Sequence, residues 1–279
     1  MDTAWNVTEF ILLGLTQKQE LQQIYFVLFL FFYAVTVLGN LLIIVIINQS
    51  EHLNSPMYSF LNYLCFVDIC YSSVTARKPI TDFLVERKTI SFGGYMAQLF
   101  WSHFFGFTEI FLLTVMAYDQ YIAICKLRHY TTIMIGLVCG QMVVALWVGG
   151  FLHSMVQTLL SIHLPFCGPN EIDHYFWPAL SQVRLACADT YLVGIMVVEN
   201  TGMISLSCFV VLIVSYVIIL VSLKTHSSKG HCKTVSTCAS HITVVIIFFG
   251  PCIFMYLRSS TTFSEDKMVV VFYTIITLY

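Results

Sequence analysis

The sequence predicts an all-α membrane protein, a seven-transmembrane helix bundle in which the seventh helix is incomplete. Two observations carry this prediction. Apolar residues make up 58% of the 279-residue chain and charged residues only 10%, whereas a soluble domain carries about 25% charged residues. In addition, six apolar segments are long enough to cross a bilayer as helices, for which about 20 residues are needed.

A polar segment precedes the first apolar run. Residues 1–23 contain Asp2, Glu9 and Glu20, and they lack the basic start and small-residue cleavage site of a secretory signal peptide. We therefore expect residues 1–23 to be an extracellular N-terminus and residues 24–279 to form the helix bundle. The first span of that bundle would act as a signal-anchor.

The long apolar segments are interpreted as helices, because strands of a membrane barrel alternate in polarity and these segments do not. They cover approximately Ile24–Ile47, Met57–Ala76, Tyr95–Tyr118, Ile135–Val156, Tyr191–Leu223 and Ala239–Leu257. The seventh, Met268–Tyr279, would reach only about 18 Å as a helix, against a hydrocarbon core of about 30 Å. We therefore expect a partial seventh span.

Charge and motif content exclude several classes of protein. The net charge of −2 gives no indication of nucleic-acid binding. The ten cysteines show no Cys-x-x-Cys pair and no His/Cys ligand spacing, so we expect no zinc site. Neither a nucleophile elbow nor a phosphate loop is present, so we expect no enzymatic activity.

Orientation in the membrane is not settled by charge. If the N-terminus is outside, Lys and Arg are more numerous on the outer side, which opposes that orientation. Most acidic residues share the outer side, and Asn6-Val7-Thr8 is a glycosylation sequon that is usable only in the lumen. These two features favour an outer N-terminus.

The stretch MAYDQYIAIC, from Met116 to Cys125, closes the third apolar segment. It resembles the end of the third span in the olfactory receptors, a rhodopsin-like branch of the G-protein-coupled receptors. Further family motifs follow in order along almost the whole chain: Gly39-Asn40, Pro56-Met57-Tyr58, Ser215-Tyr216, Lys233–His241, Phe248-Phe249-Gly250 and Phe272-Tyr273-Thr274.

The resemblance implies a receptor in the plasma membrane with its N-terminus outside, in contact with membrane lipid. It implies binding of small hydrophobic volatile odorants and signalling through a stimulatory heterotrimeric G protein. The implied ligand-binding positions lie in the outer half between spans three, five and six. They are Leu99, Ser102, His103, Gly106, Phe107, Asn200, Thr201, Ile204, Phe249, Cys252 and Tyr256. For each of them, helix packing is the alternative role.

The implied coupling switch is Asp119, Gln120 and Tyr121, and here the chain departs from the family. The family has arginine where this chain has Gln120, and glutamine lacks the charge and the fixed fork of donors of a guanidinium group. The chain also stops at Tyr279, before the family's last switch elements. The alternative prediction is therefore a vestigial receptor-derived protein that no longer couples and is retained in the endoplasmic reticulum.

Asp68 and Glu109 are ionisable groups inside spans, where they are expensive unless paired or solvated. The resemblance implies that they form a sodium site, which suits carboxylate oxygens. The alternative is that one or both carry a proton. Apart from sodium we expect no cofactor and no metal.

Two covalent features are also expected. Asn6 is the expected glycosylation site. The resemblance implies a disulfide between Cys167 and Cys187, while Tyr95 and Trp177 occupy the two cysteine positions of the family's other outer-loop bridge.

Overall fold

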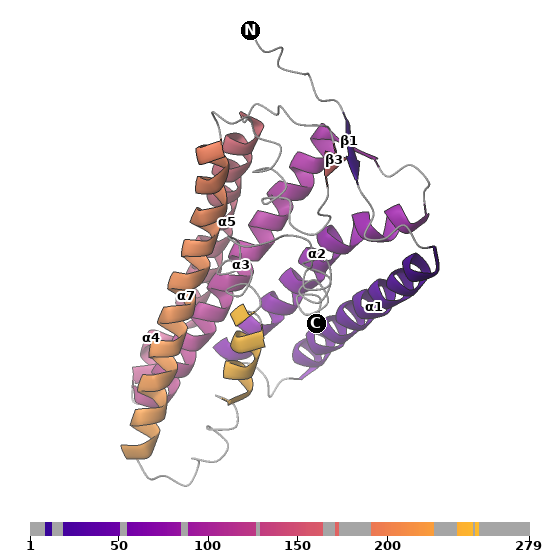
Figure 1. Cartoon of the computed structure of the whole chain (residues 1–279). Coiled ribbons are helices and arrows are strands. Elements are labelled where there is room, and N and C mark those ends of the chain that lie inside the picture. The colour runs from indigo at the N-terminus through magenta and orange to yellow at the C-terminus, as the bar shows by residue number, and fades with distance from the viewer. Residues whose placement is uncertain are drawn as a thin grey trace.

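Long helices dominate the computed structural model, which describes residues 9–12, 19–50, 55–84, 89–126, 129–163, 171–172, 191–225, 239–247 and 249–250. Its labelled helices are α1 (Gln19–Gln49), α2 (Pro56–Leu84), α3 (Phe92–Cys125), the short α4 (Tyr130–Ile133), α5 (Gly136–Ile162) and α7 (Tyr191–Thr225). Residues 239–247 and 249–250 are also helical. Figure 1 shows α3, α5 and α7 side by side, with α2 crossing toward α1.

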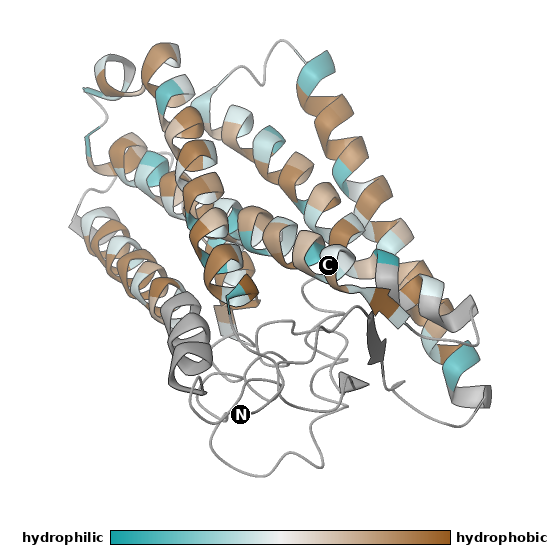
Figure 2. Ribbon diagram, turned by 90° about the horizontal axis from the view of Figure 1, so that it is seen from above, coloured by the Kyte–Doolittle hydropathy of each residue, from teal (hydrophilic) through white to brown (hydrophobic). Residues whose placement is uncertain are grey.

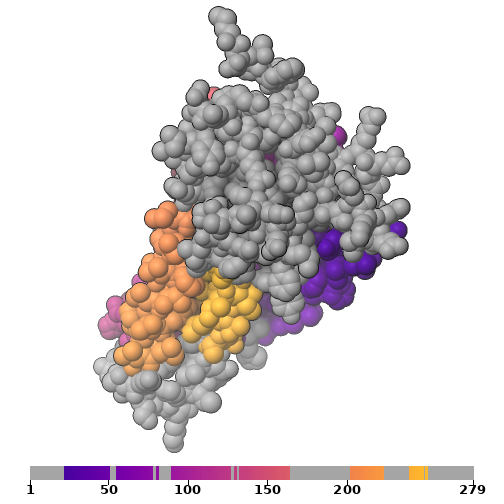
Figure 3. Space-filling model, viewed as in Figure 1, coloured from indigo at the N-terminus to yellow at the C-terminus, as the bar shows by residue number. Residues whose placement is uncertain are grey.

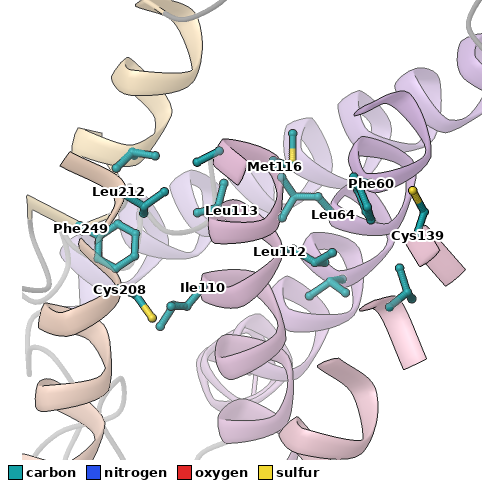
Figure 4. Packing of buried hydrophobic residues seen from close by; sticks show 14 of the residues in the cluster. Phe60, Leu64, Ile110, Leu112, Leu113, Met116, Cys139, Cys208, Leu212 and Phe249 are labelled. Atoms are coloured by element: carbon teal, nitrogen blue, oxygen red, sulfur yellow. The ribbon is translucent and has the colours of Figure 1, made fainter. Parts of the chain in front are cut away.

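The central helix is α3, which packs against α2, α5 and α7. Its side chains Ile110, Leu112, Leu113 and Met116 belong to the buried hydrophobic cluster. In Figure 4 they lie between Leu212 and Phe249 on one side and Phe60 and Leu64 on the other. Helix α3 therefore joins α2, α5 and α7 through one buried cluster.

Apolar residues dominate the helices, which are largely brown in Figure 2, and many of these residues are exposed. Leu38 on α1 is 66% exposed and Leu137 on α5 is 69% exposed. In the described part of the chain, four helices are long and apolar enough to cross a membrane: Gln22–Gln49, Phe92–Cys125, Gly136–Ile162 and Gly202–Ser222. Exposed apolar surface on this scale indicates a lipid environment.

Several helices extend beyond the apolar segments that predicted them. The third begins at Phe92 rather than Tyr95, because the Ser91 side chain caps it by accepting a hydrogen bond from the Gly94 amide at 3.2 Å. The second continues past Ala76, through Pro79, to Leu84. Apolar length predicts where a chain crosses lipid, whereas a helix ends where its backbone hydrogen bonds are replaced.

A small sheet joins three segments that are distant in sequence. Strand β1 (Glu9–Leu12) pairs antiparallel with β2 (Thr89–Ser91) and parallel with β3 (Glu171–Ile172). The strand order is β2-β1-β3. The sheet brings the N-terminal segment, the α2–α3 connection and the segment after α5 to one end of the bundle (Figure 1). The segments that carry β1, β2 and β3 would therefore lie on the same side of a membrane.

The helical residues 239–247 and 249–250 lie beside α7 (yellow and orange in Figure 3). The Phe209 and Phe249 rings are 5.5 Å apart between centroids. Tyr216 on α7 also hydrogen-bonds through its hydroxyl to Nδ1 of His241. The predicted segment Met268–Tyr279 lies outside the described residues.

Candidate functional site: two ends of the α3 helix

The predicted sodium site is a pair of enclosed carboxyl groups from neighbouring helices. Glu109 on α3 is buried at 8% exposure, and Asp68 lies on α2. Asp68 Oδ1 and Glu109 Oε2 are enclosed and have no hydrogen-bond partner within the described part of the chain. The two groups lie close enough for their charges to interact.

Such a pair cannot hold two bare negative charges, since each would lie in a low-dielectric interior beside the other. Unpartnered carboxylate oxygens are the donors that a small hard cation prefers, so the residues fit a sodium ion. Among the described residues no group of three His, Cys, Asp or Glu side chains gathers to hold a metal. Other oxygen donors would therefore have to complete the coordination of a cation here.

The predicted ligand-binding residues do not all contact the same helices, and those on α3 are described first. On α3, Leu99 is 1% exposed and the Nε2 atom of His103 is enclosed without a hydrogen-bond partner among the described residues. Phe107 stacks on Phe111, with ring centroids 4.3 Å apart. Its other stacking partner is His153 of α5, at 4.9 Å. His103 and Phe107 therefore contact the α5 side of the bundle, which the sequence did not indicate.

The remaining predicted ligand positions lie elsewhere. Ser102 is half-buried, and Gly106 has the Tyr71 ring 3.9 Å from where a Cβ would stand. Ile204 packs against the hydrophobic cluster, to which the fully buried Phe249 belongs. Asn200 and Thr201 are in α7, but their side chains are not among those described. Cys252 and Tyr256 lie outside the described residues.

Four polar residues on α5 were not singled out from the sequence: His153, Ser154, Gln157 and Thr158. Ser154 and Gln157 are both 0% exposed. The only sequence signal was their spacing, because polar residues three and four apart in an apolar helix share one face. Recognising that this face meets α3 requires the packing of the two helices.

The predicted coupling switch lies at the opposite end of α3, beside α4. Asp119 is 1% exposed and accepts a hydrogen bond from the Tyr130 hydroxyl at 3.1 Å. Gln120 is 8% exposed, and its Nε2 donates to the sulfur of Met57 on α2 at 2.7 Å. Tyr121 is half-buried and packs against the hydrophobic cluster.

Tyr130 sits on α4, outside the long helices, and is tied to the switch electrostatically. Burial, together with the neighbouring charge of Asp119, raises the pKa of the Tyr130 phenol above its usual value. The phenol therefore stays protonated and remains a hydrogen-bond donor to the carboxyl group. Asp119 is therefore hydrogen-bonded to a tyrosine, and the Gln120 amide to a thioether.

A cavity of about 370 Å³ lies at this same end, between the start of α2 and the start of α5. It is lined by Ser55, Pro56, Ser59, Phe60, Tyr63, Met134, Gly136, Cys139, Gly140 and Val143. None of the predicted ligand-binding residues lines it.

Three predicted modification sites lie outside the described residues: Asn6, Cys167 and Cys187. Glycosylation of Asn6 and the Cys167–Cys187 disulfide stay predictions. The described Tyr95, at a position where the family has cysteine, is 4% exposed at the start of α3.

Comparison with known proteins gives one consistent result. A family model described as "Olfactory receptor" matches residues 29–276. The chain is 59% identical over 277 residues to Olfactory receptor 4S2 of Homo sapiens, covering 99% of this chain and 89% of that protein. It is 58% identical over 271 residues to Olfactory receptor 4X2 of Homo sapiens, covering 97% and 89%. It is 54% identical over 272 residues to Olfactory receptor 4E2 of Mus musculus, covering 98% and 88%.

Proposed function

We propose that this chain, which belongs to the olfactory receptor family of class A G-protein-coupled receptors, binds small hydrophobic odorants within its helix bundle. Family membership makes it a multi-pass membrane protein with the seven-helix fold and a member of a receptor family rather than an enzyme. The proposal adds the ligand class, coupling to a stimulatory heterotrimeric G protein, and a plasma-membrane location with the N-terminus outside.

One observation supports ligand binding most directly. The half of α3 near β2 holds Leu99 at 1% exposure and an enclosed Nε2 atom on His103 that has no partner among the described residues. An apolar interior with a few unpartnered polar atoms is what a small volatile molecule needs for affinity and orientation.

A second candidate function is a receptor that binds odorant but does not couple. Gln120 favours this candidate, because its amide is engaged with Met57 and carries no charge to offer a G protein. Arginine at the same place would supply a cation and five donors in a fixed fork. It would also remove the Gln120–Met57 hydrogen bond, worth about 1 kcal/mol of the resting state.

The two candidates are separated by the Gln120→Arg variant in a cyclic-AMP reporter cell challenged with a broad odorant panel. If coupling is limited by Gln120, wild type responds weakly or not at all and Gln120→Arg responds to the same odorants. The matched control is Gln141→Arg, which makes the same substitution at an exposed position near the start of α5 and is expected to leave the response unchanged. Surface labelling of all three proteins corrects for delivery.

Strong signalling by wild type would contradict the second candidate. A silent Gln120→Arg variant at normal surface level would show that Gln120 is not what limits coupling. Direct binding to the purified protein decides the ligand proposal independently of any signal.

A further inference from the structure

The cavity of about 370 Å³ that lies between the start of α2 and the start of α5 is a groove along two parallel helices. Both helices begin at the end of the bundle opposite the sheet (Figure 1), and both pack against α3. The bottom of the groove is apolar, because the buried residues Phe60, Cys139 and Val143 line it. Phe60 and Cys139 are labelled in Figure 4. Hydrocarbon placed in the groove would contact the hydrophobic cluster directly.

Two glycine residues provide the room on the α5 side. Gly136 and Gly140 both line the groove, and no atom lies within 4 Å of a Cβ built at either position. Residues four apart share one face of a helix, so α5 presents bare backbone to the groove where the helix begins. The resulting volume lies within the range of about 300–1,000 Å³ that is typical of pockets for small molecules.

The groove opens toward the lipid. Ser59 and Gly140 at its edges are exposed, and Tyr63, which also lines it, is 42% exposed. Beside the groove on α5, Leu137 and Val144 are exposed apolar residues. Exposed apolar side chains around a groove indicate that it contacts acyl chains rather than water.

The length of the groove matches one leaflet of a bilayer. About one turn beyond Tyr63 and Val143, Phe66 of α2 stacks on Trp147 of α5, with ring centroids 6.3 Å apart, and these rings bring the two helices together. The rise along α5 from Gly136 to Trp147 is about 16 Å, at about 1.5 Å per residue. Half of a hydrocarbon core is about 15 Å thick. An acyl chain of one leaflet therefore fits between the helix starts and the ring stack.

The polar groups of the groove lie at the end where the helices begin. The Ser59 hydroxyl donates to the Ser55 carbonyl at 3.5 Å, and its oxygen keeps lone pairs with which it can accept a hydrogen bond. None of the described residues that line the groove has a charged side chain, so a charged headgroup would meet no opposite charge among them. A neutral headgroup that donates a hydroxyl hydrogen fits this end of the groove.

We propose that the groove between α2 and α5 is a lipid-binding site for a neutral acylglycerol. One acyl chain lies on Phe60, Cys139 and Val143, and a free hydroxyl group of the glycerol donates a hydrogen bond to Ser59 Oγ. Such a site requires only that the chain lies in a membrane, as family membership shows. It is independent of odorant binding and of coupling to a G protein.

The walls of the groove lie next to the partners of the predicted coupling switch. Pro56 lines the groove and precedes Met57, the hydrogen-bond partner of Gln120. Met134 also lines it, and the Met134 amide donates to the Tyr130 carbonyl at 2.8 Å. A lipid in the groove therefore contacts both the start of α2 and the residue that ends α4, and it stabilises the arrangement in which Gln120 is bonded to Met57.

The test uses the full chain in phosphatidylcholine nanodiscs and a monoacylglycerol that carries a photoreactive diazirine on its acyl chain. After illumination, mass spectrometry should find the label on peptides that contain residues 59–63 of α2 and 136–143 of α5. Unlabelled monooleoylglycerol should compete about fivefold better than its dimethyl ether, because one hydrogen bond is worth roughly that factor. Oleate, phosphatidylserine and cholesterol at equal mole fraction should each compete less well than monooleoylglycerol.

The key variant is Gly140→Leu, whose side chain would occupy the groove without meeting any atom within 4 Å of its Cβ. It should lose the labelling, because two groups cannot fill one closely packed space, and it should melt no lower than wild type. The matched control is Gln141→Leu, at the next position of α5, which is exposed and does not line the groove. This control should be labelled like wild type. Ser59→Ala should still be labelled but should bind monooleoylglycerol and its dimethyl ether equally well.

Each contrary outcome overturns the site in a different way. Label that is spread evenly over the lipid-facing helices, or unchanged labelling of Gly140→Leu, would show that the groove holds no particular lipid. Better competition by oleate, phosphatidylserine or cholesterol would show that the occupant is not an acylglycerol. If Gly140→Leu does not fold, Ser59→Ala decides, and an unchanged preference of that variant for the free hydroxyl group would overturn the assignment.

Discussion

The carboxyl groups of Asp68 and Glu109 need a proton or a cation to neutralise them. Each presents an enclosed oxygen without a hydrogen-bond partner in the described residues, and both lie on helices that pack together. A protonated pair and a sodium-bound pair are the two ways to remove the charge conflict. The two states differ in a measurable property, since only one of them depends on the cation in the buffer.

We expect sodium to stabilise the protein. At a sodium concentration tenfold above its dissociation constant, linkage gives about 1.4 kcal/mol. Melting in sodium chloride and in choline chloride of equal ionic strength measures the effect. Asp68→Asn and Glu109→Gln should each abolish the difference between the two salts. A wild-type protein with the same melting temperature in both salts would mean that protons, not sodium, neutralise the pair.

Gln120 and Gln157 are the same amino acid in opposite situations. Gln120 donates to Met57 at 2.7 Å, whereas neither amide atom of Gln157 has a partner in the described residues. Sequence reasoning singled out Gln120 because the family has arginine there. It passed over Gln157, because one amide in an apolar run carries no signal until its neighbours on α3 are known.

At the scale of elements, the packing of α5 on α3 depends on the absence of a side chain at Gly150. A Cβ there would stand 3.0 Å from Thr108 Oγ1 and 3.4 Å from the Phe107 ring. Thr108 cannot easily give way, because its hydroxyl donates to the Phe104 carbonyl at 2.7 Å and the residue is 1% exposed. A methyl group at this position would therefore require the neighbouring side chains of α3 to shift by a few tenths of an ångström.

Gly150→Ala is therefore expected to destabilise the protein by about 1–3 kcal/mol through overpacking. The matched control is Gly140→Ala on the same helix, where no atom lies within 4 Å of the added Cβ. The control should be neutral or gain up to about 1 kcal/mol from helix propensity. Thermal unfolding of both variants in detergent measures the difference, and equal melting temperatures would show that α5 is not closely packed on α3 at this point.

Apolar length predicted that these segments are helices, because a chain in lipid must satisfy its backbone hydrogen bonds within each segment. The residues at which the helices begin and end were harder to predict from the sequence. Ser91 caps α3 ahead of its apolar run, and α2 continues through Arg77 and Pro79. The β1–β2–β3 sheet was not predicted, since its strands have only two to four residues and pair across long stretches of sequence.

At the scale of the whole molecule, the sheet places the N-terminal segment, the α2–α3 connection and the segment after α5 on one side of the bundle. β1 therefore shares a side with β2 and β3, whichever side of the membrane that is. One measurement therefore determines the orientation, because the side of the membrane on which any one of the three segments lies is also the side of the other two.

We expect that side to be the lumenal and extracellular one, with a glycan on Asn6. Synthesis with microsomes should then give a glycosidase-sensitive mass increase that Asn6→Gln removes. This prediction is based on the glycosylation sequon, which lies in a polar segment just before β1. A wild-type product that shows no shift in microsomes, alongside a glycosylated control protein, would contradict this orientation.

The sheet also imposes an order on biosynthesis. β1 leaves the ribosome before either of its partners, and β3 follows only after α2, α3 and α5 have been made. Both edges of β1 are unpaired until β2 is made, and the edge that pairs with β3 stays open to other chains until α5 has followed. The complete three-stranded sheet can therefore form only late, after the first half of the receptor has been inserted. A conformation-specific antibody against the sheet would distinguish assembled receptors from those whose assembly has stopped earlier.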